Sequence, residues 1–261
     1  MTETKETLAI LRARWREVLL IITLDVLSFS ISMLRLILHP REQGPLLHTL
    51  ITLASLPFAI ITFLLIIGFQ RTVYLEDRKR QSPLVLLREG KHFFLPLAGL
   101  GIIYTLALAC LHALFFWTIK YTAPDFIDTH WGISLVYQLP STSVGLILMK
   151  PILLIFPLII VLDCDIFTSF KMLGRCQLRD AREVVILFLV SLGLPFLWAL
   201  LPSPHSMTIS YYLLTMAHTI AWRFIALMIA VMAIRFVASR NLIYDNNSKP
   251  LDSQDSLNPS I

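Results

Sequence analysis

The stretch Val144–Leu201 decides the fold, and it reads VGLILMKPILLIFPLIIVL (144–162), DCDIFTSFKMLGRCQLRDARE (163–183) and VVILFLVSLGLPFLWALL (184–201). Two apolar runs, each about as long as a membrane span, flank one short mixed segment. We therefore predict a transmembrane hairpin whose connection lies at the membrane surface.

The connecting segment has the pattern of a short amphipathic helix. Asp165 is placed to cap its N-terminus, because a carboxylate there accepts hydrogen bonds from the free N–H groups of the first turn. Phe167, Phe170 and Leu173 give the helix one apolar face, and Gly174 is placed to end it. We call this predicted unit (165–175) the second elbow.

Composition places the whole chain in the membrane class. Hydrophobic residues make up 56% of its 261 residues and charged residues 15%, with a mean hydropathy of +0.73. Because the apolar residues form long unbroken blocks, we predict an all-α, polytopic membrane protein. The net charge of +5 gathers beside these blocks and no basic aromatic groove is present, so no nucleic-acid partner is expected. Cys110, Cys164 and Cys176 form no C-x-x-C pair and are expected to be free thiols.

Six apolar blocks predict six transmembrane helices: Val18–Leu38, Leu46–Phe69, Phe93–Trp117, Val144–Leu162, Val184–Leu201 and Tyr211–Val237. The loops after the odd-numbered blocks contain only two basic residues, Arg41 and Lys120. The other Lys and Arg outside the blocks lie in the alternate polar segments, at 1–17, 71–92, 163–183 and in the C-terminal tail. Because basic loops remain on the cytoplasmic side, this alternation predicts that both termini are cytoplasmic.

A first elbow is predicted between the second and third blocks. Ser82-Pro83 has the pattern of a helix start, and Gly90-Lys91 has the pattern of a helix stop. The hairpins 46–117 and 144–201 then form a weak parallel repeat. Chance similarity between apolar sequences is the alternative explanation.

The ends of the chain are polar. Residues 1–17 are predicted to be a cytoplasmic segment, 18–237 the six-helix membrane domain, and 238–261 a disordered cytoplasmic tail rich in Asn, Ser, Asp and Pro. The first block lacks a small-residue cleavage site after it, so we expect it to be retained as a helix. Residues 120–143 are predicted to form a long loop.

The run FPLIIVL (156–162), which leads into FTSFKMLGR (167–175), resembles a set of bacterial six-helix membrane proteins. These include the YciC-type inner-membrane proteins and the membrane domain that precedes some glycerophosphodiester phosphodiesterases. The resemblance covers roughly residues 46–201, and it implies the six-helix fold and a location in the bacterial inner membrane. The chain departs from these families where they place a small residue within the elbow helix.

Polar residues inside apolar blocks are costly and mark candidate sites. In the first block Asp25, Ser28, Ser32 and Arg35 fall within an arc of about 80°, at about 100° per residue. The sixth block has a similar stripe: Thr215, Thr219, Arg223, Ala226, Ala230 and Ala233. The third block has another: Ala98, Gly101, Thr105, Ala109 and His112. We expect all three stripes to face the bundle interior, because small and hydroxylated residues let helices approach closely.

Arg223 lies near the middle of its block, and Asp25 is the acidic residue well inside an apolar block. We predict a contact between these two side chains, either direct or through water. The pair either only fixes helix packing or belongs to a polar cavity for a headgroup or ion. Lys150, just before Pro151, is expected to extend toward the outer interface; alternatively Pro151 and Pro157 open the helix toward a cavity.

No catalytic motif occurs, and the histidines show no metal-ligand spacing, so we expect no enzyme activity, metal or cofactor. The favoured function is a transporter-like protein or membrane subunit that handles a solute or lipid. The alternative is a scaffold or assembly factor that docks partners through its elbows, and an intramembrane enzyme is a weaker third. The expected partner is the lipid bilayer, with a protein partner or homo-oligomer left open.

Overall fold

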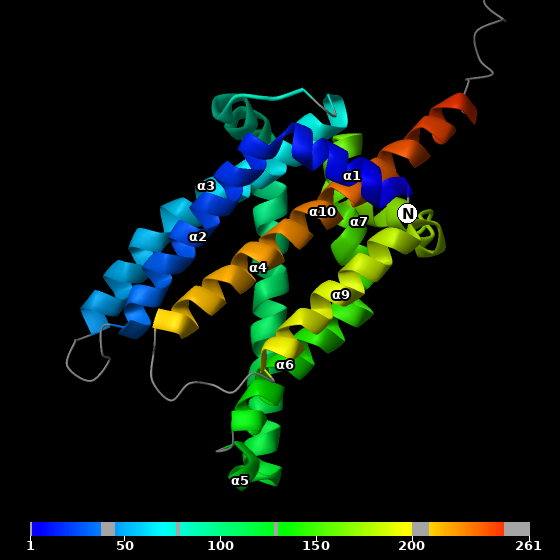
Figure 1. Cartoon of the computed structure of the whole chain (residues 1–261). Helices are drawn as coiled ribbons and strands as arrows, with labels where there is room; N and C mark the ends of the chain where they lie inside the picture. The colour runs from blue at the N-terminus through cyan, green and yellow to red at the C-terminus, as the bar shows by residue number, and fades with distance from the viewer. Residues whose placement is uncertain (1, 38–44, 77–78, 128–129, 200–208, 248–261) are drawn as a thin grey trace, which may run out of the picture.

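The computed structural model describes residues 2–37, 45–76, 79–127, 130–199 and 209–247, and over these ranges the chain is all-α (Figure 1). Its helices are α1 (Thr2–Ala13), α2 (Trp15–Ile37), α3 (Pro45–Leu75), α4 (Pro83–Thr122), α5 (Pro124–Ile127), α6 (His130–Ile147), α7 (Met149–Leu162), α8 (Ile166–Leu173), the 3-10 helix η1 (Leu178–Ala181), α9 (Arg182–Ala199) and α10 (Ile209–Asn247). The predicted turn at 39–44, the turn at 202–208 and the tail from residue 248 lie outside the described residues.

Three helices, α3, α4 and α10, are long and apolar enough to cross a membrane. A fourth span is possible if α6 and α7 count as one span bent by 63°. The blocks predicted at Val18–Leu38 and Val184–Leu201 correspond to α2 and α9, which do not meet this criterion over their described residues. The all-α class is thus confirmed, with three or four candidate spans.

Helical structure extends into both polar ends of the chain. Residues 2–13 form α1, which buries Ile10 and Leu11 against the bundle, so the first segment is a packed helix. The prediction of disorder from residue 238 is wrong for its first ten residues, since α10 continues to Asn247. The sequence analysis did not predict α1 or the last ten residues of α10, because both stretches are mostly polar.

The second elbow is confirmed as α8. The side chain of Asp165 accepts a hydrogen bond from the N–H of Thr168 at 2.6 Å, as an N-cap does. The predicted apolar face divides: Leu173 is buried, whereas Phe167 is 80% exposed and Phe170 48% exposed. Gly174 follows the helix in a right-handed conformation, so the helix ends without the left-handed turn that glycine favours.

The predicted start of the first elbow is confirmed, since Ser82 caps α4 and Pro83 is its first residue. Its predicted stop is wrong, because α4 runs without interruption from Pro83 to Thr122 and Gly90 lies inside it. The two glycines of this region serve a close helix contact instead. A Cβ atom on Gly68 of α3 would lie 1.8 Å from the carbonyl oxygen of Leu86, and one on Gly90 would lie 2.0 Å from that of Leu64. The backbones of α3 and α4 therefore touch where these glycines meet.

The predicted loop at 120–143 is also wrong, since α4 continues to Thr122 and the helices α5 and α6 follow. The break in this region occurs later, at Leu148, between α6 and α7. Pro151 explains its position, because a proline lacks an N–H and its ring clashes with the carbonyl four residues earlier, here that of Ile147. The run 144–162, predicted as one helix, is therefore divided between α6 and α7.

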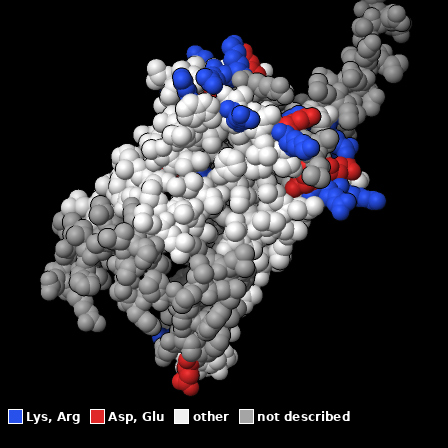
Figure 2. Space-filling view, viewed as in Figure 1, with Lys and Arg blue, Asp and Glu red and all other residues white. Residues whose placement is uncertain are grey.

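The buried residues concentrate toward one end of the bundle. One apolar cluster joins α7 to α3, α4, α9 and α10, and the other joins α1 and α2 to α3 and α10. The helices diverge away from this end (Figure 1). On the face seen in Figure 2, charged side chains gather at the same end and the middle of the surface is almost free of them. We call this the charged end; both α1 and the last turns of α10 lie there (Figure 1).

Candidate functional site

The predicted contact between Asp25 and Arg223 is confirmed. Arg223 of α10 donates two hydrogen bonds to the carboxylate of Asp25 on α2, from Nε to Oδ2 at 2.8 Å and from Nη2 to Oδ1 at 2.5 Å. The side chains are 18% exposed for Asp25 and 27% for Arg223. This two-pronged geometry joins residues 198 apart in the chain.

The pair has a structural role whatever its function. Removing one member of a buried ion pair leaves an uncompensated charge, which costs several kcal/mol in fully buried cases. Arg223 lies 12 residues before Arg235, which is about 18 Å along the helix axis at ~1.5 Å per residue. The pair therefore lies deep in the bundle, away from the charged end.

The other members of the first stripe do not join Asp25 as a set. Ser32 is exposed, and its hydroxyl donates to the carbonyl of Ser28, one turn earlier in α2, at 3.0 Å. Ser28 is half-buried. Arg35 lies within α2, but its side chain is outside the described residues.

His112 and Thr219 lie on different parts of the bundle. The Nδ1–H of His112 donates to the carbonyl of Leu108 at 2.8 Å, and its Nε2 is hydrogen-bonded to the hydroxyl of Ser141 on α6 at 3.1 Å. The hydroxyl of Thr219 donates to the carbonyl of Thr215 within α10. His112 thus links α4 to α6, whereas the hydrogen bond of Thr219 stays within α10.

The third-block stripe does not face the bundle interior as predicted. Thr105 and Ala109 are exposed, and a Cβ atom on Gly101 would meet nothing within 4 Å. The sixth-block stripe does face inward: Thr215 and Ala233 are buried, and Ala226 and Ala230 are half-buried. The difference arises because α10 crosses the bundle, whereas this part of α4 packs on few neighbours.

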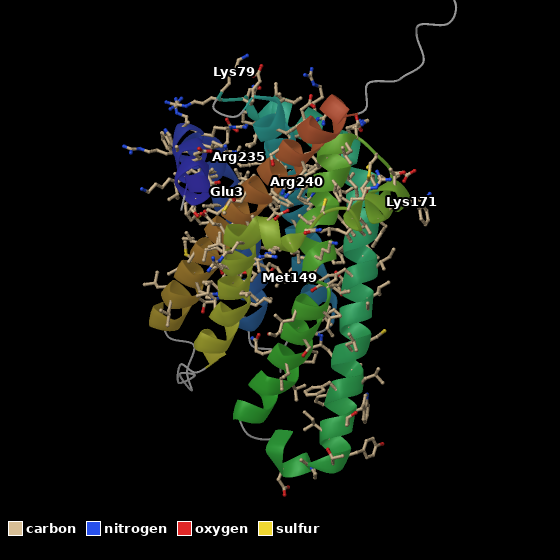
Figure 3. All side chains as sticks on the ribbon, turned by 90° about the vertical axis from the view of Figure 1, so that its right-hand side faces the viewer. Glu3, Lys79, Met149, Lys171, Arg235 and Arg240 are labelled. Carbon is tan, nitrogen blue, oxygen red and sulfur yellow. The ribbon has the colours of Figure 1, made fainter. Side chains whose placement is uncertain are left out.

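Lys150 lies in the first turn of α7, next to the break at Leu148, and is half-buried. Figure 3 places its neighbour Met149 well below the charged end, in the middle of the bundle. The ammonium is close enough to Cys176 for its charge to act on that thiol, although burial dominates and raises the pKa of Cys176. The extension of Lys150 toward the outer interface stays a prediction.

A cavity of about 320 Å³ lies between α3, α4, α6, α7, α9 and α10. Apolar side chains form most of its wall, with polar groups from Gln70, Tyr104, Ser191 and Trp222. Of the described residues that line it, none carries a charge. Its volume is at the small end of the roughly 300–1,000 Å³ range of ligand pockets.

The cavity and the ion pair are neighbours on α10 but separate features. Trp222 and Ala226 line the cavity, whereas Arg223 does not and instead turns toward α2. The wall also includes Gly145, three residues before the break. The bent α6–α7 connection therefore shapes one side of the cavity, and the Asp25–Arg223 pair supports the helix on its other side.

A buried polar cluster at the charged end was not predicted from the sequence. Arg14, fully buried, donates from Nε to Glu17 at 2.8 Å and from Nη2 to Thr72 at 2.7 Å, and its guanidinium lies 4.6 Å from the ring centroid of Phe69. Glu17 accepts from the N–H of Gln81 at 2.8 Å. The available signal was the i, i+3 Arg14–Glu17 pair set among apolar residues.

A second missed cluster lies at the C-terminal end of α7. Arg71 donates from Nη1 to the carbonyl of Ile160 at 2.5 Å, and Asp163 accepts from or pairs with Nε2 of His92 at 2.9 Å. A cation at a helix C-terminus is stabilised by the carbonyls there. Asp163 itself takes the left-handed conformation, with φ of 50°, as a C-terminal cap often does.

Among the described residues, no group of three His, Cys, Asp or Glu is placed to hold a metal ion. The arrangement that the structure does provide is a neutral cavity in an apolar bundle. Comparisons with protein families, curated proteins and solved structures found no match to this chain.

Proposed function

We propose that this chain is a six-span protein of a bacterial inner membrane, with both termini in the cytoplasm, and that its bundle binds a lipid or small solute without catalysing a reaction. The six spans would be α2, α3, α4, the bent α6–α7 pair, α9 and α10. The resemblance of 156–175 to the YciC-type membrane proteins supports the same arrangement.

The charge distribution supports this orientation. The described Lys and Arg residues of α1, of the α3–α4 connection and of α8 and η1 gather at the charged end (Figures 2 and 3). At the other end of α4, Lys120 is the basic residue of the last turn. A basic end normally remains in the cytoplasm, so the charged end is the cytoplasmic one in this proposal.

The cavity beside the α6–α7 break is the observation that carries the binding function. Transporters commonly place their sites near the bilayer midplane next to interrupted helices. Here the break at Leu148 lies in the middle of the bundle, and the cavity lies between this bent pair and α10. A closed, fully packed core would offer no such volume.

Gentle purification from native membranes, followed by mass spectrometry of lipids, solutes and proteins, tests the proposal. We expect one molecule enriched over the bulk membrane lipids at close to one copy per chain. Filling the cavity with Ala230→Phe should remove the enriched molecule, whereas Ala221→Phe, at an exposed position on the same helix, should not. No enrichment with the unsubstituted protein would contradict the proposal.

A scaffold function is the second candidate, because α8 exposes Phe167 and Phe170 beside Lys171 at the charged end. Such a surface suits either lipid headgroups or a partner helix. Replacing both phenylalanines with serine should remove a stoichiometric protein partner if α8 is a docking surface. Retention of every co-purifying protein in that variant contradicts the scaffold.

A further inference from the structure

Gln70 is the unusual residue of the cavity wall. It lies on α3 with only 7% of its surface exposed, and it lines the cavity. Within the described part of the chain its Oε1 has no hydrogen-bond partner. Buried side-chain polar atoms are nearly always paired, so an unpaired amide at a cavity indicates a place where a ligand supplies the missing bond.

The other polar groups of the wall do not explain Gln70. Ser191 donates its hydroxyl to the carbonyl of Phe188 at 2.7 Å, within its own helix. The part of the wall that α10 contributes includes the small residues Ala226, Ala230 and Ala233, which leave space. The open volume and the unpaired amide therefore occur together.

The absence of charge in the described wall restricts the ligand. A phosphate, carboxylate or ammonium group placed here would be buried without a counter-ion, which is strongly unfavourable. A hydroxyl is suited to the amide, because it can donate to Oε1 and also accept from the amide N–H. The small volume fits one hydrocarbon chain better than the two chains of a phospholipid.

We infer that the cavity binds a neutral, single-chain lipid whose hydroxyl group hydrogen-bonds to Gln70. The inference rests on the proposed binding function and adds the chemical class of the ligand. A long-chain alcohol or a monoacylglycerol has this chemistry. The chain lies along the apolar wall between α7 and α10, and the hydroxyl reaches α3.

Photolabelling of the full chain tests this inference. The protein is placed in nanodiscs of phosphatidylethanolamine and phosphatidylglycerol and exposed to a long-chain alcohol that carries a diazirine in its chain. The labelled peptides are identified by mass spectrometry, with unlabelled dodecan-1-ol, dodecane or dodecyl phosphate as competitors. Lipid-facing peptides report the background labelling from the bilayer.

We expect labelling of peptides from α3, α7 and α10 that dodecan-1-ol suppresses and the other two competitors do not. Gln70→Leu should lower the suppressible labelling about fivefold, as the loss of one hydrogen bond predicts. The matched control is Thr62→Val, which also removes a buried, unpartnered polar group from α3 but lies outside the cavity wall. It should leave labelling unchanged.

Equal labelling in Gln70→Leu and Thr62→Val overturns the inference. Competition by dodecyl phosphate or dodecane as strong as that by dodecan-1-ol also overturns it, and in that case binding in the cavity, and with it the proposed function, survives. Labelling that no competitor suppresses overturns both. Since Gln70→Leu removes an unsatisfied buried group, we expect it to fold, and its melting temperature checks this.

Discussion

Two regions of the bundle, the α3–α4 pair and the bent α6–α7 pair beside α10, use small residues in opposite ways. In the first, Gly68 and Gly90 bring two backbones into contact and leave no space between them. In the second, a proline breaks the helix and alanines of α10 border an open cavity. Small residues thus give close packing where two helices face each other and a void where a bent helix cannot follow its neighbour.

The largest expected effect comes from filling the close contact. Gly68→Ala places a methyl group within 1.8 Å of the Leu86 carbonyl, a backbone atom that cannot rotate away. We expect a loss of about 3 kcal/mol, the upper end of typical overpacking costs. Thermal unfolding in detergent measures it, with Gly101→Ala as the control, because a methyl group there meets nothing within 4 Å. Equal stability of the two variants contradicts the contact.

Breaking the ion pair comes next. Arg223→Ala leaves Asp25 without its partner, and we expect a loss of about 2 kcal/mol, less than for a fully buried pair because both groups are partly exposed. The double variant Asp25→Ala, Arg223→Ala should recover part of this loss, since no charge then remains unpaired. Thermal unfolding of the unsubstituted protein, the single variants Asp25→Ala and Arg223→Ala and the double variant gives the coupling free energy between the two side chains. Additive losses in the double variant argue against a stabilising pair.

Restoring an N–H at the break tests whether Pro151 causes it. With Pro151→Ala, the helix can form the missing bond to Ile147, and α6 and α7 should straighten. For spin labels at residues 139 and 162, a 63° bend shortens the separation by about 5 Å relative to a straight helix at ~1.5 Å per residue. Pulsed electron resonance should therefore show that the distance between the two labels is longer in Pro151→Ala than in the unsubstituted protein. An unchanged distance would assign the bend to packing.

The smallest effect concerns the helix cap of α8. The hydrogen bond from the N–H of Thr168 lowers the pKa of Asp165 below its ordinary value of 3.8. A lowered pKa means that the cap stabilises α8 above pH 3.8 and is lost as the pH falls through the lower, folded-state pKa. Hydrogen exchange of the α8 amides should therefore accelerate in that acid range. Asp165→Asn, which still caps, should remove the pH dependence but keep the protection.

The sequence predicts the features that follow from local or single-helix rules. The cap at Asp165 and the contact of Asp25 with Arg223 were both found this way, because a carboxylate before a helix and a charge inside an apolar block each have few favourable solutions. Gly90 was misread because a glycine before a lysine has the same local pattern at a helix end and at a close helix crossing. Only the neighbouring helix α3 distinguishes the two cases.

The cavity could not be predicted, because it depends on six helices at once. The alanines of α10 were correctly assigned to the interior, but the same stripe would equally suit a close contact. The void exists because α7 leaves the direction of α6 at Leu148. Gln70 comes directly after the apolar block 46–69, and nothing in the sequence shows that its amide oxygen lacks a partner.

The separation of Asp25 from Arg223 has a consequence for biosynthesis. Asp25 leaves the ribosome 198 residues before its partner, which is about 10–40 s at ~5–20 residues per second. During this interval α2 carries an uncompensated acid, and α1 also waits for Glu183 and Arg235, which follow much later in the chain. The contact between α2 and α10 can therefore form only after the last helix has been made.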